Sequence, residues 1–386
     1  MVKLIKNATV YTPKYIGKKD ILILNGKIAI IEEGINIDNF PLDIQMYDFS
    51  GKIVVPGFID GHVHITGGGG EGDFSTRTPE INLRQLIKGG ITTVVGCLGT
   101  DGITRSLENL YAKAKALNKE GVNAFIYTGS YAVPPVTFTG SIAKDIVLID
   151  RVIGVGEIAI SDHRSTQPTL EEIKKIVSNA RLGGLISGKA GIVNFHVGSG
   201  KFGIDYLFDI VKDTEIPIIN LYPTHMNRNK KLLEQGIEFA KMGGFFDLTT
   251  SFSTNEDKIR TVNYLMECYK SKVIDRVTLT SDGQGSLPKF DKDGNFIGLQ
   301  IGEVTSLYEI VKTSVKKGYL PLEEALKTIT VNPSRVLKLK FKGRLEKGYD
   351  ADLVVLNENL EIDSVVSRGD FLMYKEKIVK KGTFED

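Results

Sequence analysis

The 386-residue sequence contains no tryptophan and only two cysteines, Cys97 and Cys268. One falls in an expected strand and the other in an expected helix, so we interpret both as reduced core residues rather than as a disulfide. No apolar run approaches the ~20 residues that cross a bilayer, and the N-terminus has no apolar signal core. These absences predict a cytoplasmic protein that has no membrane partner.

Strong charge of either sign is also absent. The sequence has 49 lysines and arginines against 47 aspartates and glutamates, which leaves a net charge of +2 at pH 7. A charge this close to zero gives no general attraction to nucleic acid, so we expect no nucleic-acid partner. The length allows two or three domains, or one large barrel with an appendage.

The two ends of the chain share one pattern. Residues 1–55 and 335–386 consist of short apolar runs separated by turns, and Asn25-Gly26 between two such runs indicates a β-hairpin. We therefore predict that both ends build one small β domain.

Residues 56–334 alternate between apolar strands and segments with helical periodicity. Helical spacing is found at 170–180, 206–212, 231–240 and 258–269, and candidate strands lie at 54–64, 92–100, 123–131, 154–161, 191–197, 217–225, 245–251 and 277–283. Eight such units match an α/β fold of the (β/α)₈ TIM-barrel type, which typically needs about 250 residues. The glycine run that follows the first strand lacks the GxGxxG spacing of a dinucleotide-binding sheet.

Histidines gather at the ends of the predicted barrel strands. His62 and His64 form an HxH pair at the end of the first strand, where residues two apart point to the same face. His196 ends the fifth strand, His225 the sixth, and Asp282 the eighth. Because barrel active sites lie at the carboxyl ends of the strands, this pattern predicts a metal site, with Zn²⁺ preferred over Mn²⁺, Fe²⁺ or Co²⁺.

A carboxylate interrupts the fourth strand, GVGEIAIS, which is otherwise apolar. A lone buried charge is costly, so Glu157 should be paired, protonated or bound to a metal. Coordination of two cations by Glu157 would offset this cost. The alternatives are an ion pair with Arg164 or a protonated glutamate in the core. His163, just past this strand, suits a structural role as well as a ligand role.

The motifs around these residues resemble a known family. GFIDGHVH, the strand-end histidines and TSDG are similar to the amidohydrolase superfamily of metal-dependent hydrolases. Within it, HVHITGGGGEGD, LGTDGITRS, TGSYAVP, ISDHRS, PTHMNRN and SDGQGS resemble the isoaspartyl (β-aspartyl) dipeptidases, and the resemblance continues to KGTFED. It implies a binuclear barrel with two Zn²⁺ per subunit, a small β-sandwich domain built from both chain ends (1–55 and 335–386), and a large homo-oligomer such as an octamer.

The resemblance also implies which residues bind the metals. His62, His64 and Asp282 would bind the more buried ion, and His196 and His225 the second.

The sequence departs from the family at the bridging ligand. The usual family member bridges the ions with a carbamylated lysine on the fourth strand, but no lysine occurs between Lys144 and Lys174, and Glu157 stands in that place. Glutamate is shorter, so the strand must come closer to the metals, and Gly156 would tolerate the bulge this needs. We expect Glu157 to bridge the ions, without a carbamylated lysine.

The activity implied by the resemblance is hydrolysis of the β-aspartyl amide bond of dipeptides, through attack by a hydroxide that bridges the two ions. Asp282 would pass the hydroxide proton to the leaving amine, and Tyr131 would donate a hydrogen bond to the developing oxyanion. Glu71 would hold the substrate ammonium, and two arginines its carboxylates. The complete substrate-binding set would be Gly69, Glu71, Thr100, Tyr131, Arg164, Arg228 and Ser286.

Two other interpretations remain open. A cyclic-amidohydrolase of the dihydroorotase or hydantoinase type would share the metal site, but it would not need Glu71 together with two arginines at the rim. A metal-free scaffold protein would be expected to have lost ligands, whereas every ligand position of this sequence is filled.

Overall fold

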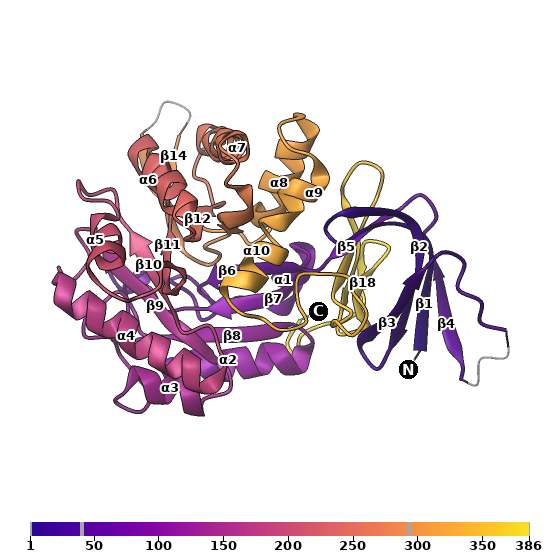
Figure 1. Cartoon of the computed structure of the whole chain (residues 1–386), viewed down its shortest axis with the longest axis horizontal. Coiled ribbons are helices and arrows are strands. Elements are labelled where there is room, and N and C mark those ends of the chain that lie inside the picture. Colours follow the sequence, from indigo (N-terminus) through magenta and orange to yellow (C-terminus); the bar gives the residue numbers. More distant parts are fainter. Residues whose placement is uncertain (1, 39–41, 292–294, 386) are drawn as a thin grey trace.

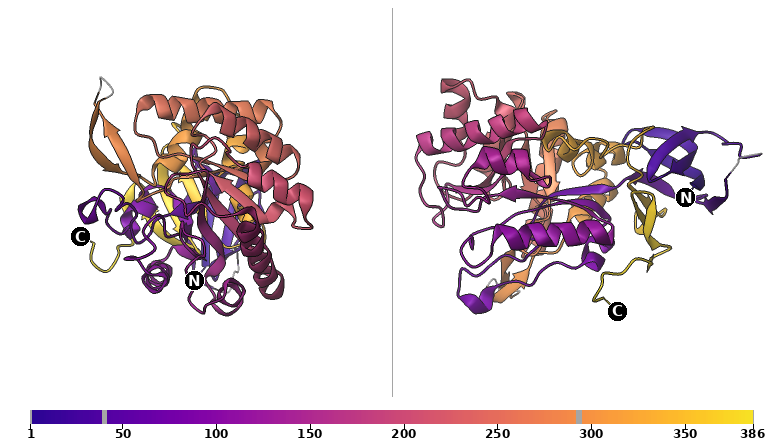
Figure 2. Two further views of the ribbon diagram at one scale, coloured as in Figure 1. Left: turned by 90° about the vertical axis from the view of Figure 1, so that its left-hand side faces the viewer. Right: turned by 90° about the horizontal axis from the view of Figure 1, so that it is seen from below.

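The computed structural model describes residues 2–38, 42–291 and 295–385. Strands from the two chain ends lie together at one side of a larger group of strands covered by helices (Figures 1 and 2). In the described part of the chain, no helix is both long enough and apolar enough to cross a membrane.

The two chain ends share a nine-stranded sheet with the order β19-β18-β17-β16-β5-β1-β2-β3, in which β4 pairs with β1. Antiparallel pairing of β5 with β16 joins the two ends. Asn25 and Gly26 connect β2 to β3 with φ angles of 49° and 75°, which confirms the predicted hairpin. The strands are β1 (Val2–Tyr11), β2 (Tyr15–Leu24), β3 (Lys27–Glu32), β4 (Ile44–Asp48), β5 (Ile53–Pro56), β16 (Leu353–Leu356), β17 (Ile362–Ser367), β18 (Asp370–Tyr374) and β19 (Lys377–Ile378).

The middle of the chain forms the parallel strands of a TIM-barrel-like fold. Six of these strands form one parallel sheet in the order β11-β10-β9-β8-β7-β6, and β12 pairs in parallel with β13. A parallel bridge between Val63 of β6 and Gly283, just after β13, links the first barrel strand to the last. The strands are β6 (Phe58–Val63), β7 (Ile91–Gly96), β8 (Asn123–Thr128), β9 (Val152–Ile160), β10 (Ile192–Val197), β11 (Leu221–Thr224), β12 (Phe246–Thr249) and β13 (Val277–Thr280).

Helices with one buried apolar face alternate with these strands, as predicted. Capping boxes start two of the longest: Thr169 with Glu172 at α4, and Thr254 with Asp257 at α7. The α-helices are α1 (Leu83–Lys88), α2 (Leu107–Glu120), α3 (Ile142–Leu148), α4 (Leu170–Ser187), α5 (Asp205–Asp213), α6 (Lys230–Lys241), α7 (Asn255–Lys270), α8 (Ser306–Lys316), α9 (Leu322–Lys327) and α10 (Val331–Val336).

Short elements complete the described chain. The hairpin of β14 (Ser286–Phe290) and β15 (Phe296–Ile301) projects from the helix-covered body (Figure 2). Three 3-10 helices, η1 (Phe74–Thr76), η2 (Ile218–Asn220) and η3 (Ile274–Arg276), lie in connections.

Two of the predicted barrel strands begin four residues later than expected, at Phe58 and at Leu221. The segment expected as one strand at 54–64 divides into β5, which belongs to the nine-stranded sheet, and β6, which enters the barrel. Gly57 lies between them and packs so closely against Thr92 that a side chain would collide there. The segment expected at 217–225 begins with η2, so the strand itself starts at Leu221.

The strand that carries Glu157 contains the predicted bulge. Val155 of β9 pairs with Val193 of β10, and Ile158 pairs with Phe195. Two residues of β9, Gly156 and Glu157, therefore lie opposite one residue of β10, Asn194. An added Cβ at Gly156 would lie 2.9 Å from the Cβ of Asn194. Glycine is therefore needed for the two strands to approach each other at the bulge.

Candidate metal centre and substrate pocket

Four histidines surround the carboxylate of Glu157, which is 1% exposed. Its Oε2 lies 3.3 Å from His62 Nε2, 3.1 Å from His196 Nδ1 and 3.5 Å from His225 Nε2. Its Oε1 lies 3.5 Å from His64 Nε2. These residues come from β6, β9 and β10, and from positions just after β6 and β11, so the carboxyl ends of the barrel strands bring them together.

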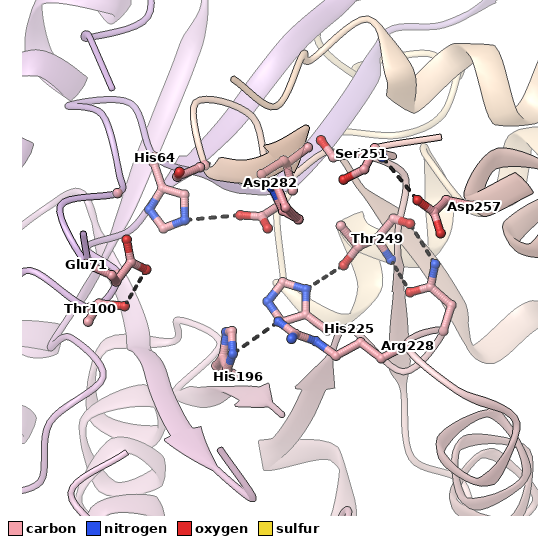
Figure 3. Close-up of a pocket in the computed structure, with 18 of the residues that line it drawn as sticks. His64, Glu71, Thr100, His196, His225, Arg228, Thr249, Ser251, Asp257 and Asp282 are labelled. Atoms are coloured by element: carbon pink, nitrogen blue, oxygen red, sulfur yellow. Dashed lines mark hydrogen bonds and ion pairs between the residues drawn. The ribbon is translucent and has the colours of Figure 1, made fainter. Parts of the chain in front are cut away.

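Asp282 completes the cluster from the end of β13. Its Oδ1 lies 3.1 Å from His64 Nε2 and 3.6 Å from His62 Nε2, and Figure 3 shows its carboxylate directed at the His64 ring. Asp282 and His225 both follow strand ends with positive φ angles, 53° and 65°. This left-handed conformation is uncommon outside glycine and is typical of functional sites.

The cluster fits a divalent cation. One ligand atom from each of His62, His64, Cys97 and Glu157 lies within 4.8 Å of the others, and Glu157, His196 and His225 form a second such group. Glu157 belongs to both groups. Glu157 Oε1 and His62 Nε2 are buried without a hydrogen-bond partner, which is costly unless a cation is bound between them.

Each imidazole turns its other ring nitrogen toward a separate partner. This arrangement is typical of metal-binding histidines, because the partner fixes the tautomer and the orientation of the ring. The pairs are His62 Nδ1 with Asn194 Oδ1 (3.1 Å), His64 Nδ1 with Cys97 Sγ (3.8 Å), His196 Nε2 with Asp162 Oδ2 (3.1 Å) and His225 Nδ1 with Thr249 Oγ1 (2.5 Å).

The electrostatics of the cluster suit a metal. Burial alone would raise the pKa of Glu157, but the charge of His62 and hydrogen bonds from the surrounding histidines outweigh it and hold the pKa well below its usual range. Burial and the charge of His196 lower the pKa of His225 to about 3, so this ring stays neutral and able to bind a cation. Both directions favour the forms that bind a cation, an ionised Glu157 and a neutral His225.

The structure places Arg164 and His163 away from the Glu157 carboxylate. Arg164 does not pair with Glu157: its Nη2 lies 2.9 Å from Asp162 Oδ2 and its Nη1 lies 3.1 Å from Glu71 Oε1. The side chain of His163 is 90% exposed and its Nδ1 lies 3.5 Å from Asp162 Oδ1, outside the group of rings around Glu157.

A cavity of about 350 Å³ opens onto the cluster. It brings together all the residues predicted to bind substrate, and Figure 3 shows Glu71 and Thr100 on one side of it and Ser251 and Asp257 on the other. His62 and Glu157 lie beneath the floor and are 0% and 1% exposed. The predicted residues in the wall are Gly69, Glu71, Thr100, Tyr131, Arg164, Arg228 and Ser286, next to His64, His196, His225 and Asp282.

Several polar contacts order this wall. Thr100 Oγ1 donates a hydrogen bond to Glu71 Oε1 at 3.0 Å, and the Tyr131 hydroxyl lies 2.6 Å from His196 Nδ1. Arg228 Nη2 lies 3.2 Å from His196 Nε2. Among the residues that the structure describes, Arg228 has no carboxylate within ion-pair distance, in contrast to Arg164 with its two.

Sequence reasoning missed other residues of the site. Cys97 is free and buried, as expected, but it also belongs to a candidate ligand group. The strand-end argument that found the histidines applies to it as well, because it directly follows β7. Asp162 lies in the ISDHRS motif beside Arg164, but no role was predicted for it. Asp257 and Arg260 of α7, which line the opposite wall of the cavity, lie in no recognised sequence motif.

Comparison with known proteins agrees with this geometry. The amidohydrolase family model matches residues 53–372. A β-aspartyl dipeptidase from Fervidobacterium islandicum AW-1, solved in complex with a β-Asp-Leu dipeptide, is 60% identical, covers 100% of this chain and 99% of its own, and superposes with a TM-score of 0.94. A second structure of a β-aspartyl dipeptidase from this bacterium is 57% identical, with full coverage of both chains and a TM-score of 0.92.

More distant relatives share the general fold. The chain is 28% identical to the dihydroorotase of Elusimicrobium minutum (strain Pei191) over 93% of this chain and 89% of that protein. A D-hydantoinase from Thermus is 16% identical, covers 100% of this chain and 98% of its own, and superposes with a TM-score of 0.70, which supports the TIM-barrel-like fold alone. The chain therefore belongs to the amidohydrolase family and, within it, to the β-aspartyl dipeptidases.

Proposed function

We propose that this chain is a metal-dependent dipeptidase that hydrolyses the β-aspartyl amide bond of dipeptides. The observation that carries the proposal is a single cavity that joins the histidine and carboxylate cluster to Glu71, Arg164 and Arg228. A β-aspartyl dipeptide has one ammonium and two carboxylates, which Glu71 and the two arginines can match. The further charged pair in the far wall, Asp257 and Arg260, is joined at 2.8 Å. The relatives support this reading, since one of them was solved with β-Asp-Leu bound.

The metal content we propose is two Zn²⁺ per chain. His62, His64 and Asp282 would hold one ion and His196 and His225 the other, with Glu157 shared between them and no carbamylated lysine. The support is that Glu157 is common to both groups of candidate ligands. When bound, the ions supply an activated water as nucleophile and polarise the substrate carbonyl.

The chain's own residues move the proton and stabilise the developing charge. Asp282 reaches into the cavity, where it can accept the proton of the nucleophile and return it to the leaving amine. Burial and the charge of Glu157 raise the pKa of Tyr131 well above its usual value, so its hydroxyl keeps its proton. Tyr131 can therefore donate a hydrogen bond to the oxyanion.

The charged groups of the wall would orient the dipeptide. Arg228 has no carboxylate partner among the described residues and is free to form a bidentate pair with a substrate carboxylate. Arg164 is held by Asp162 and can pass its Nη1 donor from Glu71 to the second carboxylate, while Glu71 takes the ammonium. Gly69, Thr100 and Ser286 would add polar contacts around the aspartyl half.

The cyclic-amidohydrolase alternative has less support. The distant relatives include dihydroorotases, and the metal cluster alone would suit such an enzyme. A cyclic amide such as dihydroorotate has no free ammonium group, so Glu71 would have no partner in it.

We also propose the organisation of the whole protein. Residues 1–55 and 335–386 would form a β-sandwich domain beside a catalytic barrel domain of residues 56–334, in keeping with the sheet that both ends share. A cytoplasmic homo-oligomer is proposed as well. Leu182, Leu185 and Ile186 on α4 are 49%, 61% and 64% exposed, which suits a surface that another subunit covers.

The decisive experiment compares two isomeric substrates, β-Asp-Leu and α-Asp-Leu, on the zinc-loaded protein. The wall recognises charges at fixed positions, so we expect kcat/KM for the β isomer to exceed that for the α isomer by about a thousandfold or more. Release of free aspartate measures both rates, and the protein treated with a chelator is the control. Equal rates for the two isomers would remove the β-aspartyl assignment.

A further inference from the structure

We propose that Asp162 is a positioning residue that holds a metal ligand, His196, and a substrate-binding residue, Arg164, in one fixed arrangement. The part that concerns the substrate rests on the proposed dipeptidase function, whereas the part that concerns the metal does not.

The contacts of Asp162 account for both of its carboxylate oxygens. Oδ2 lies 3.1 Å from His196 Nε2 and accepts a hydrogen bond from Arg164 Nη2 at 2.9 Å. Oδ1 accepts hydrogen bonds from Arg164 Nε at 3.0 Å and from the backbone N–H of Arg164 at 2.8 Å. The side chain is 4% exposed, so water competes little for these bonds.

The fold brings Asp162 close to His196 through a glycine. Asp162 follows β9 and His196 lies on the neighbouring strand β10, with Gly198 two residues further along. An added Cβ at Gly198 would lie 2.5 Å from the Cβ of Asp162. A glycine at this position therefore lets the carboxylate reach the histidine ring.

Asp162 differs from the partners of the other three histidines. Those partners are an amide, a thiol and a hydroxyl, from Asn194, Cys97 and Thr249. A carboxylate that accepts the Nε2 proton of His196 fixes Nδ1 as the nitrogen that faces Glu157, and it makes the ring a stronger ligand. The same carboxylate accepts two parallel hydrogen bonds from the guanidinium of Arg164, whose remaining nitrogen, Nη1, faces the cavity.

One carboxylate thus links the metal cluster to substrate recognition. Any change that moves Asp162 should weaken metal binding at His196 and also displace Arg164. Changes to either neighbour alone should affect only one of these properties.

The test is Asp162→Asn, which keeps the shape of the side chain but loses its charge and one acceptor oxygen. Zinc affinity of the metal-free protein is measured by competition with a chromophoric chelator, and KM and kcat for β-Asp-Leu are measured with excess zinc. We expect the weaker of the zinc-binding steps to lose about 10- to 100-fold in affinity and KM to rise about tenfold.

Three matched variants separate the two effects. Arg164→Gln should raise KM while zinc affinity stays within about threefold of the wild type, because the Asp162 carboxylate stays beside His196 even though the contact of Arg164 Nη2 with His196 Nε2 at 3.1 Å is lost. Thr249→Val removes the partner of His225 and should weaken zinc binding without the rise in KM. His163→Ala changes the exposed neighbour of Asp162 and should alter neither property.

The proposal is overturned if Asp162→Asn leaves both zinc affinity and KM within about twofold of the wild type, or if it changes only one of them. If this variant does not fold, Asp162→Glu takes its place with the same two readouts, because it keeps the charge and shifts the carboxylate by one methylene. A wild-type chain that does not cleave β-Asp-Leu would refute the dipeptidase function, and the zinc measurements would still decide the role of Asp162 toward His196.

Discussion

At the scale of single residues, Glu157 decides the character of the site. Its oxygens lie between 3.1 and 3.5 Å from a ring nitrogen of each of four histidines. A buried, ionised glutamate would be strongly unfavourable in an apolar strand, and no arginine or lysine pairs with it in the described structure. Its charge lies instead at the candidate cation site, where a bound cation would compensate a carboxylate in an otherwise apolar strand.

Replacement of this residue tests that view. The wild-type chain should hold about two zinc ions, and Glu157→Ala should hold one or none, because a ligand common to both groups is lost. Activity should fall by at least about a hundredfold, since loss of a direct ligand costs more than loss of an outer partner. Metal analysis and the β-Asp-Leu assay measure the two effects, with exposed Glu358→Ala as control. Unchanged metal content and activity would show that Glu157 has only a structural role.

At the scale of single elements, the bulge in β9 explains how a short carboxylate reaches the cluster. The extra residue at Gly156 and Glu157 bends the strand locally, and the missing side chain of Gly156 lets β9 pack against Asn194. Asn194 is also the partner of His62 Nδ1, so the bulge and the orientation of a second ligand depend on the same contact.

The matching variant is Gly156→Ala. Its Cβ would lie 2.9 Å from the Cβ of Asn194, so we expect the free energy of unfolding to fall by about 1–3 kcal/mol and zinc affinity to fall with it. Gly61→Ala is a close control, because Gly61 also precedes a candidate ligand on a barrel strand but has no neighbour nearer than 3.5 Å. Urea unfolding and chelator competition provide the measurements. Equal stability of the two variants would mean that β9 does not need glycine at its bulge.

At the scale of the whole molecule, the sheet from the two chain ends is tied to the barrel through Asp352. Its Oδ2 accepts hydrogen bonds from Asn123 on β8 of the barrel at 3.3 Å and from Lys342 at 2.6 Å. Its Oδ1 accepts one from the backbone of Arg368 at 2.7 Å. Lys342 also lies 2.6 Å from Asp350 and is 7% exposed, so one buried cation pairs with both carboxylates at this junction, and Lys27 pairs with Asp350 as well.

Loss of that cation should destabilise the whole protein. Lys342→Met leaves the buried carboxylate of Asp352 without its cation, whereas Asp350 keeps its ion pair with Lys27, and we expect a loss of about 3–5 kcal/mol in the free energy of unfolding. Calorimetry of the metal-free protein should show one lowered transition, because the junction joins the sheet and the barrel. Lys340→Met, at an exposed lysine nearby, should change little. A wild-type melting profile for Lys342→Met would show that the junction is held by other contacts.

Much of this organisation could be predicted from the sequence, because its signals are local. Strands and helices of the barrel follow from apolar periodicity within ten or so residues, and the HxH pair places two imidazoles on one face wherever its strand lies. The residues missed have a weaker local signal, a position just after a strand. Cys97 resembles any buried thiol, and Asp162 shows its importance only when β9 and β10 lie side by side.

The sequence by itself determined the kinds of chemistry available: four strand-end histidines, a glutamate in an apolar strand, and the motifs of the β-aspartyl dipeptidases. Only the tertiary structure decided how they combine. In the structure, Arg164 pairs with Asp162 and not with Glu157, and the side chain of His163 is exposed to solvent. The carboxylate of Glu157 lies close to all four histidine rings. The physical reason is that hydrogen bonds and ion pairs act over a few ångströms, so partners far apart in the chain are chosen only when the barrel strands are brought together.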